Sequence, residues 1–143
     1  MANEQNNQNT RVSYDVGSLV GKEPVDIDKY NFIDTKIESV EIHNYGKAGE
    51  EERLRLVVKT QKVDEQNNNM RGVEFITLFR DKDSPQIDSQ IPNIAYSQSP
   101  NSTAQKMLTW FKVNNFKELE GMDCKTQVRL KDNGNKSLGI YYG

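Results

Sequence analysis

Short segments in which apolar and polar residues alternate constrain this chain most, because successive side chains of a β-strand point to opposite faces of a sheet. The clearest of them is 53–61, RLRLVVKTQ. One side of it would carry Leu54, Leu56 and Val58, and the other Arg53, Arg55, Val57 and Lys59. With four further segments of strand-like composition, this pattern predicts a mostly β protein.

Two strands are expected before the middle of the chain, on either side of 53–61. Residues 30–43 are rich in β-branched side chains, and a change of phase near Glu38 and Ser39 predicts a bulge in a long, bent first strand. Residues 73–80, VEFITLFR, are apolar on both faces, as in a central strand covered on each side. Because charged residues are rarely buried, Glu74 and Arg80 are expected to face water, which sends Phe75 and Phe79 into the core.

A helix and a hairpin are expected in the last third. Ser102, followed by Gln105, has the spacing of a capping box, and Met107 and Phe111 recur at helical spacing, so a helix is predicted from Thr103 to Val113. Trp110 is expected to plug the core from this helix, as are Phe116 and Leu119 after it. Residues 122–131 alternate again, with Cys124 on the inward side, and Asn133-Gly134 predicts a two-residue type I′ turn to a last strand at 137–142.

The length of 143 residues suits one domain, predicted at 11–143. Residues 1–10 are rich in Asn and Gln and are expected to be a flexible polar tail, while residues 12–24 could form a short strand or a lid. No apolar stretch is long enough to cross a bilayer, and the first residues lack the order of a secretion signal. With Cys124 as the single cysteine, a reducing, cytoplasmic location is expected, or the interior of a host cell if the protein is virus-encoded.

Charge is distributed unevenly although the formal net charge is only −2. Residues 1–52 hold 5 Lys and Arg against 11 Asp and Glu, and residues 53–143 hold 14 against 10. The asymmetry would allow one face to attract phosphates while another keeps the molecule in solution, although an ordinary domain can carry such a difference without any function.

Three strands, a helix and a two-stranded hairpin follow one another from Tyr30 to Gly143, and in this order of elements the chain resembles the OB-fold, a small five-stranded barrel. The points of similarity are the bent first strand NFIDTKIESVEIH, the helix between the third and fourth strands, and FKELEGMDCKTQVRL as the entry to the fourth strand. Proteins of this family commonly bind oligonucleotides on strands 2 and 3, so the resemblance implies a single-stranded nucleic-acid-binding barrel.

Such a binder needs cations along the phosphate backbone and aromatic rings for the bases. We expect phosphate contacts from two outward basic stripes and from the end of the third strand, and stacking on three tyrosines. The candidate residues are Arg53, Arg55, Lys59, Arg80, Lys125, Arg129, Lys131, Tyr45, Tyr96 and Tyr141. Outward strand positions are often Lys or Arg in any soluble protein, and each tyrosine could equally be an ordinary surface residue.

Catalytic patterns are weak in this sequence. His43 is the single histidine, so a metal site with two imidazoles is excluded, and neither GxGxxG nor GxxxxGK occurs. Asp81 and Asp83 offer too few oxygen ligands for a hard cation on their own, and a pair of Cys124 and His43 would require the inward thiol to be reactive. We therefore expect a non-enzymatic protein without metal or cofactor.

The function predicted from these features is binding of single-stranded nucleic acid, with DNA favoured over RNA, with little sequence preference, in replication or strand protection. The alternative is a non-catalytic barrel that contacts a protein, such as an accessory protein or a virus-encoded inhibitor, through its acidic N-terminal third that includes Glu50–Glu52. No membrane partner is expected, and the oligomeric state stays open.

Overall fold

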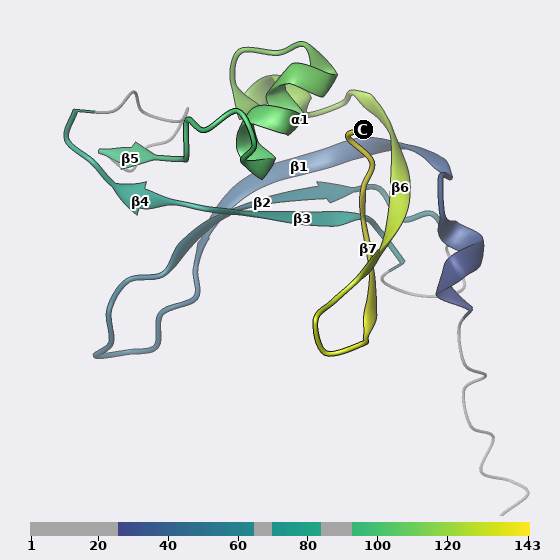
Figure 1. The fold of residues 1–143 in the computed structure, drawn as a ribbon, viewed down its shortest axis with the longest axis horizontal. Coiled ribbons are helices and arrows are strands. Elements are labelled where there is room, and N and C mark those ends of the chain that lie inside the picture. The colour runs from purple at the N-terminus through teal and green to yellow at the C-terminus, as the bar shows by residue number, and fades with distance from the viewer. Residues whose placement is uncertain (1–25, 65–69, 84–92) are drawn as a thin grey trace, which may run out of the picture.

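A five-stranded antiparallel sheet with the strand order β3-β2-β1-β6-β7 forms most of the structure (Figure 1). The computed structural model describes residues 26–64, 70–83 and 93–143. The strands are β1 (Asp34–Asn44), β2 (Leu54–Thr60), β3 (Val73–Thr77), β6 (Asp123–Leu130) and β7 (Lys136–Ile140). A small second sheet contains β4 (Phe79–Arg80) and β5 (Ile94–Ala95), and the helices are η2 (Ile27–Tyr30), α1 (Thr103–Phe111) and η3 (Phe116–Leu119). The mostly β prediction, with one α-helix before a final hairpin, is confirmed for these residues.

β1 is long because it pairs with two different strands. Its first residues pair with β6, and its remainder pairs with β2. The register shifts between Ile37 and Ser39, at the bulge that the sequence predicts. Ile37 is fully buried at this point, so the bend lets one strand turn the sheet around the core.

α1 lies over one side of the sheet, next to the C-terminal residues (Figure 1). The Ser102 hydroxyl caps it by accepting a 3.2 Å hydrogen bond from the Gln105 amide. The helix ends at Phe111 rather than at Val113, because Lys112 adopts a left-handed conformation with φ of 57°.

The buried face of α1 consists of Ala104, Met107, Leu108 and Phe111. The prediction that Trp110 plugs the core is wrong, since this side chain is 48% exposed beside that face. The predicted plugs after the helix are confirmed, because Phe116 and Leu119 in η3 have no exposed surface.

The third predicted strand is divided at Leu78, and its phase is opposite to the one expected. Ile76 and Leu78 face the core, whereas Phe75 and Phe79 are 48% and 44% exposed. Placing both phenylalanines inside was therefore wrong, as was a strand covered on both faces. Glu74 is the reason: its carboxylate is buried, with 7% exposure, because it finds partners on β6 and β7.

β3 and β7, the outer strands of the sheet, lie against each other without a backbone ladder, so the sheet is not hydrogen-bonded into a closed barrel. Glu74 bridges this seam: one carboxylate oxygen lies 2.8 Å from the Arg129 guanidinium and accepts a 3.2 Å hydrogen bond from the Ile140 amide. Gly72 and Gly139 bring the two backbones close, since a Cβ on Gly72 would lie 2.7 Å from the Gly139 carbonyl oxygen.

The last hairpin is present, but its turn is not the two-residue type I′ turn that was predicted. Leu130 and Lys136 form the last strand pair, and Gly134 has a positive φ of 84° while Asn133 does not. The inward phase of β6 is confirmed for Cys124 and Thr126. It is lost toward the turn, where Leu130 is 72% exposed because the strand has passed the edge of the core.

The predictions for the tail at 1–10, for a strand or lid at 12–24 and for most of the connection after Asp83 lie outside the described residues. Among the residues that are described, no helix is both long and apolar enough to span a bilayer.

Candidate nucleic-acid interface

The outward sides of β1, β2 and β3 form one continuous surface, called here the outer face. Antiparallel pairing places opposite residues on the same side of a sheet, so the register defines its rows. The rows are His43, Arg55 and Thr77; Glu41, Val57 and Phe75; and Ser39, Lys59 and Val73. Val57, at the centre, is 1% exposed although it points away from the core cluster, because the surrounding side chains cover it.

Arg55 lies between two exposed aromatic rings. Its guanidinium carbon is 5.3 Å from the ring centroid of Tyr45 and 5.7 Å from that of Phe75, both within the range of cation–π attraction. The two rings meet edge to face at 6.1 Å, and they are 43% and 48% exposed. These three residues, the aromatic–arginine cluster, combine a cation with flat apolar surfaces open to solvent.

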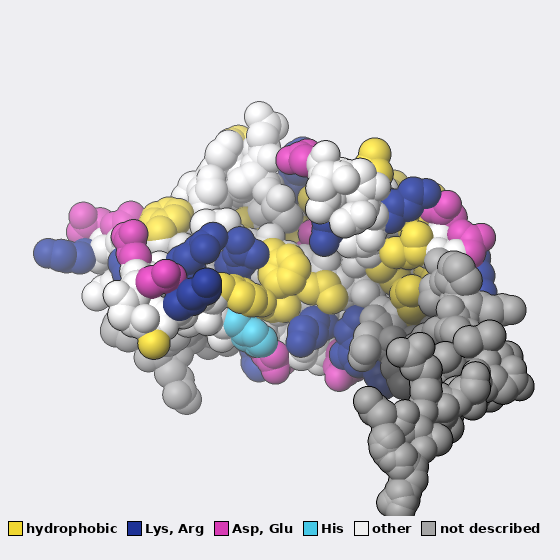
Figure 2. Space-filling model, turned by 90° about the horizontal axis from the view of Figure 1, so that it is seen from below, with side chains coloured by type: hydrophobic (Ala, Val, Ile, Leu, Met, Phe, Trp, Pro, Cys, Tyr) yellow, Lys and Arg dark blue, Asp and Glu magenta, His cyan; other side chains and the backbone are white. Residues whose placement is uncertain are grey.

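The cations of the outer face are not neutralised by neighbouring acids. Within the described ranges, no carboxylate forms an ion pair with Arg53, Arg55 or Lys59. Glu41, the acid of the face, lies 3.0 Å from Nε2 of His43. Figure 2 shows hydrophobic side chains between groups of Lys and Arg, with the histidine at their border. The surface is therefore suited to a ligand that is both anionic and aromatic.

Arg80, the last residue of β4, differs from these cations because it is paired with an acid. Its Nε and Nη2 atoms donate to the two carboxylate oxygens of Glu52 at 2.9 and 2.8 Å. This hydrogen-bonded pairing lowers the pKa of Glu52 and raises that of Arg80. Arg80 is therefore bound to an acid at this end of the strand.

The basic stripe expected on β6 is divided among three environments. Lys125 forms an ion pair with Asp34, and Arg129 binds Glu74 while its guanidinium carbon lies 4.7 Å from the Tyr142 ring centroid. Lys131 is exposed at the hairpin turn. The structure does not bring these residues together with Arg55 into one free cationic track.

The three candidate tyrosines also separate. Tyr45 belongs to the aromatic–arginine cluster, whereas Tyr96 packs edge to face on the buried Phe116 with centroids 5.2 Å apart, and burial raises the pKa of its hydroxyl. Tyr141 lies between Phe32 and Trp110, on another part of the surface. Phe75 is the residue of this surface that the sequence analysis had placed in the core. Alternation puts Phe75 and Ile76 on opposite faces, but it does not tell which of the two faces is buried.

The sequence offers two pairs with a potential for chemistry, Cys124 with His43 and Asp81 with Asp83. Cys124 pairs with Thr35 near the start of β1, far along the strand from His43. Burial raises the pKa of the Cys124 thiol to about 11, and the neighbouring Asp123 acts in the same direction. The Asp81 carboxylate accepts a 3.0 Å hydrogen bond from the Asp83 amide, and the described residues include no group of three potential metal ligands.

Comparison with known proteins gave no relative: no family model, curated protein or solved structure matches this chain.

Proposed function

We propose that the protein binds single-stranded nucleic acid, DNA in the first place, on the outer face of β1, β2 and β3. The observation that carries the proposal is the placement of Arg55 between the exposed rings of Tyr45 and Phe75. Bases stack on such rings whatever their sequence, and the guanidinium and Lys59 supply positive charge for the phosphates. The activity is binding and protection of a strand, without catalysis.

The order of strands supports the same proposal. We interpret the sheet as a partly open OB-like barrel, in which β1, β2, β3, β6 and β7 correspond to the five strands and α1 to the helix between the third and the fourth. Oligonucleotides bind such barrels on the face of strands 2 and 3 and on the loop between strands 1 and 2. Phe75 and Arg55 lie on that face, and Tyr45 lies in that loop.

A titration of fluorescent oligo-dT at two salt concentrations tests the proposal. Affinity should fall as salt rises, with a slope of about −0.7 for each phosphate neutralised. Phe75→Ala should weaken binding by roughly 5- to 150-fold, the equivalent of 1–3 kcal/mol for one stacked base. Phe75 is half exposed and does not belong to the main core cluster, so this substitution should leave that cluster intact.

A matched pair of charge variants separates the cluster from net charge. Arg55→Gln and Lys136→Gln each remove one positive charge, but Lys136 is already paired with Asp28 at 2.9 Å. Only Arg55→Gln should reduce affinity markedly. If Arg55→Gln and Phe75→Ala bind oligo-dT with the same affinity as Lys136→Gln and the wild type, this site is contradicted. If the wild type does not bind oligo-dT even at low salt, the alternative of a protein-binding barrel is favoured.

A further inference from the structure

A second group of exposed aromatic residues lies apart from the outer face. Trp110 of α1 and Phe32 both contact Tyr141 edge to face, with ring centroids 5.2 and 5.4 Å from that of Tyr141. Trp110 and Phe32 are 48% and 50% exposed. Large apolar rings in contact with water at one place are typical of surfaces that bind a partner or ligand.

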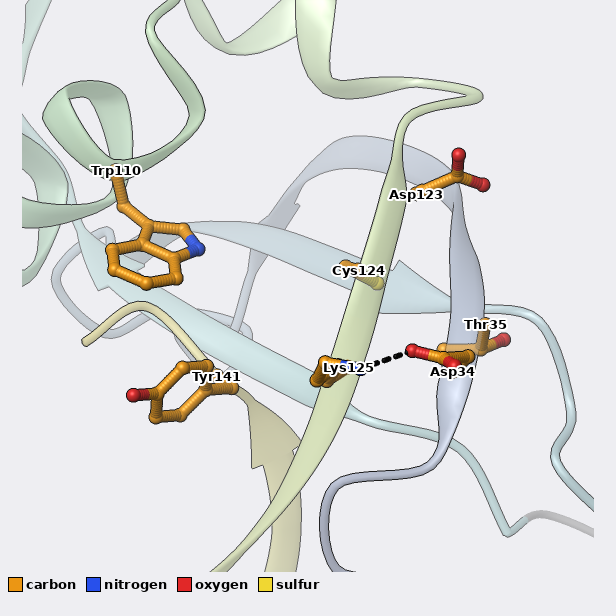
Figure 3. Close-up of a pocket in the computed structure, with 7 residues that line it drawn as sticks. All are labelled: Asp34, Thr35, Trp110, Asp123, Cys124, Lys125 and Tyr141. Carbon is orange, nitrogen blue, oxygen red and sulfur yellow. Dashed lines mark hydrogen bonds and ion pairs between the residues drawn. The ribbon is translucent and has the colours of Figure 1, made fainter.

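Trp110 forms a wall of two hollows. On one side is a cavity of about 500 Å³ between Trp110, Tyr141 and the start of β6, where Figure 3 shows the Trp110 ring directed toward Tyr141 and Lys125 bound to Asp34. On the other side is a cavity of about 580 Å³. Its lining residues are Pro100, Lys106, Thr109, Trp110, Lys112 and Tyr142.

The two hollows differ in charge. In the first, Lys125 is paired with Asp34, and Asp123 is paired with Lys36 at 2.7 Å. The second has no acidic residue in its lining, and no carboxylate in the described part of the chain pairs with Lys106 or Lys112. Two unpaired cations therefore stand beside the exposed indole of Trp110.

We infer that this second hollow, the Trp110 hollow, is an additional contact point for the same single strand that the outer face binds. One base would stack on Trp110, and the phosphates beside it would lie against Lys106 and Lys112. This inference rests on the proposed function, because it needs a ligand that carries bases and phosphates together. Charge complementarity favours this occupant: an apolar protein surface would cover both ammonium groups without a counter-charge, whereas a nucleic-acid backbone supplies one.

The consequence is that affinity depends on the length of the strand. A short oligonucleotide reaches the outer face alone, while a longer one can reach the Trp110 hollow as well, and the second contact then acts within one complex at high effective concentration. OB-type barrels cover about 4–16 nucleotides, so oligo-dT of about 5 and about 20 nucleotides are suitable probes.

Trp110 is the single tryptophan of the chain and therefore reports directly on its own hollow. The 20-nucleotide probe should quench the intrinsic tryptophan fluorescence of the full-length protein, and the 5-nucleotide probe, bound at saturation, should not. Trp110→Ala should weaken binding of the long probe by roughly 5- to 150-fold and leave the short probe unaffected, while Trp110→Phe should retain part of the affinity. The double variant Lys106→Gln, Lys112→Gln should also lower the salt slope for the long probe only.

The outcomes separate this inference from the proposed function. If Phe75→Ala weakens binding of both probes but Trp110→Ala and the double variant bind the long probe like the wild type, the outer face is a contact point and the Trp110 hollow is not. Failure of the wild type to bind either probe overturns both proposals. Equal loss of both probes in Trp110→Ala would contradict a second, length-dependent contact.

Discussion

Arg55 shows how a single residue acquires a role from its surroundings. On β2 it alternates with buried residues like any outward side chain, but the rings of Tyr45 and Phe75 fix its guanidinium near the middle of the outer face. Arginine suits this position because its planar group stacks on rings and still donates hydrogen bonds at its edges. Lysine in its place would keep the charge without this stacking.

Cys124 provides a prediction at the same scale. With a thiol pKa of about 11, raised first by burial and then by Asp123, about one molecule in a thousand carries the thiolate at pH 8. Modification by a maleimide or by a disulfide reagent should therefore be slow in the folded protein, rising about tenfold for each pH unit up to that pKa. Rapid modification at pH 8 that urea does not accelerate would show that the thiol is not buried.

Single residues also show where the sequence misleads. Glu74 and Phe75 are neighbours, and local composition assigns the charged one to water. The structure buries Glu74 because Arg129 and the Ile140 amide, both distant in the chain, meet it there. Since partners of this kind are brought together only by the fold, the phase of β3, and with it the exposure of Phe75, could not be read from the strand itself.

Secondary-structure elements were more predictable, because their signals are local. Alternation in 53–61, the Ser102 cap and the Asn133-Gly134 turn each predicted an element that is present. The helix pattern did not show whether Trp110 is buried, because Trp110 lies at the border of the face that Met107 and Phe111 define. Its exposure depends on where the sheet ends, which the helix sequence does not contain.

The seam between β3 and β7 gives a prediction at the scale of an element. A Cβ on Gly139 would lie 2.7 Å from Oε1 of Glu74 and 3.2 Å from Cγ of Arg129, so Gly139→Ala must displace this pair. We expect a loss of about 1–3 kcal/mol in the free energy of unfolding, measured by urea denaturation. Ser137→Ala, on the same strand, is the control, and a Gly139→Ala protein of wild-type stability would show that the seam yields without cost.

At the scale of the whole molecule, the net charges of the two halves of the sequence do not show which charged side chains form ion pairs in the fold. Many are paired across elements, as in Lys36 with Asp123 and Lys136 with Asp28. Among the residues that the structure describes, no carboxylate forms an ion pair with Arg55, Lys59, Lys106 or Lys112. The sequence could not show that two of the three cations expected on β6, Lys125 and Arg129, are paired with acids.

Stability should depend on pH through Glu74. Its pKa is raised, mainly by burial, with Arg129 opposing the shift, so the folded protein holds this proton more tightly than the unfolded chain. The free energy of unfolding should consequently fall as pH rises from the ordinary glutamate range near about 4.3 through the raised value.

Glu74→Gln isolates this contribution, because glutamine resembles the protonated acid and does not titrate. Relative to this variant, the wild type should lose stability with rising pH, by at most about 1.4 kcal/mol per pH unit, in thermal denaturation between pH 4 and 7. Exposed carboxylates such as Glu120, whose pKa Lys117 lowers, act in both proteins and cancel in the comparison. A difference that grows in favour of the wild type would mean that attraction to Arg129 outweighs burial.

The contact of β3 with β7 also bears on self-association. Outermost strands carry backbone donors and acceptors that can recruit a foreign strand and start aggregation. In this protein β3 and β7 lie against each other and are linked by Glu74, so each strand covers part of the other strand's edge. Loss of that bridge would open both strand edges to pairing with a strand of another molecule.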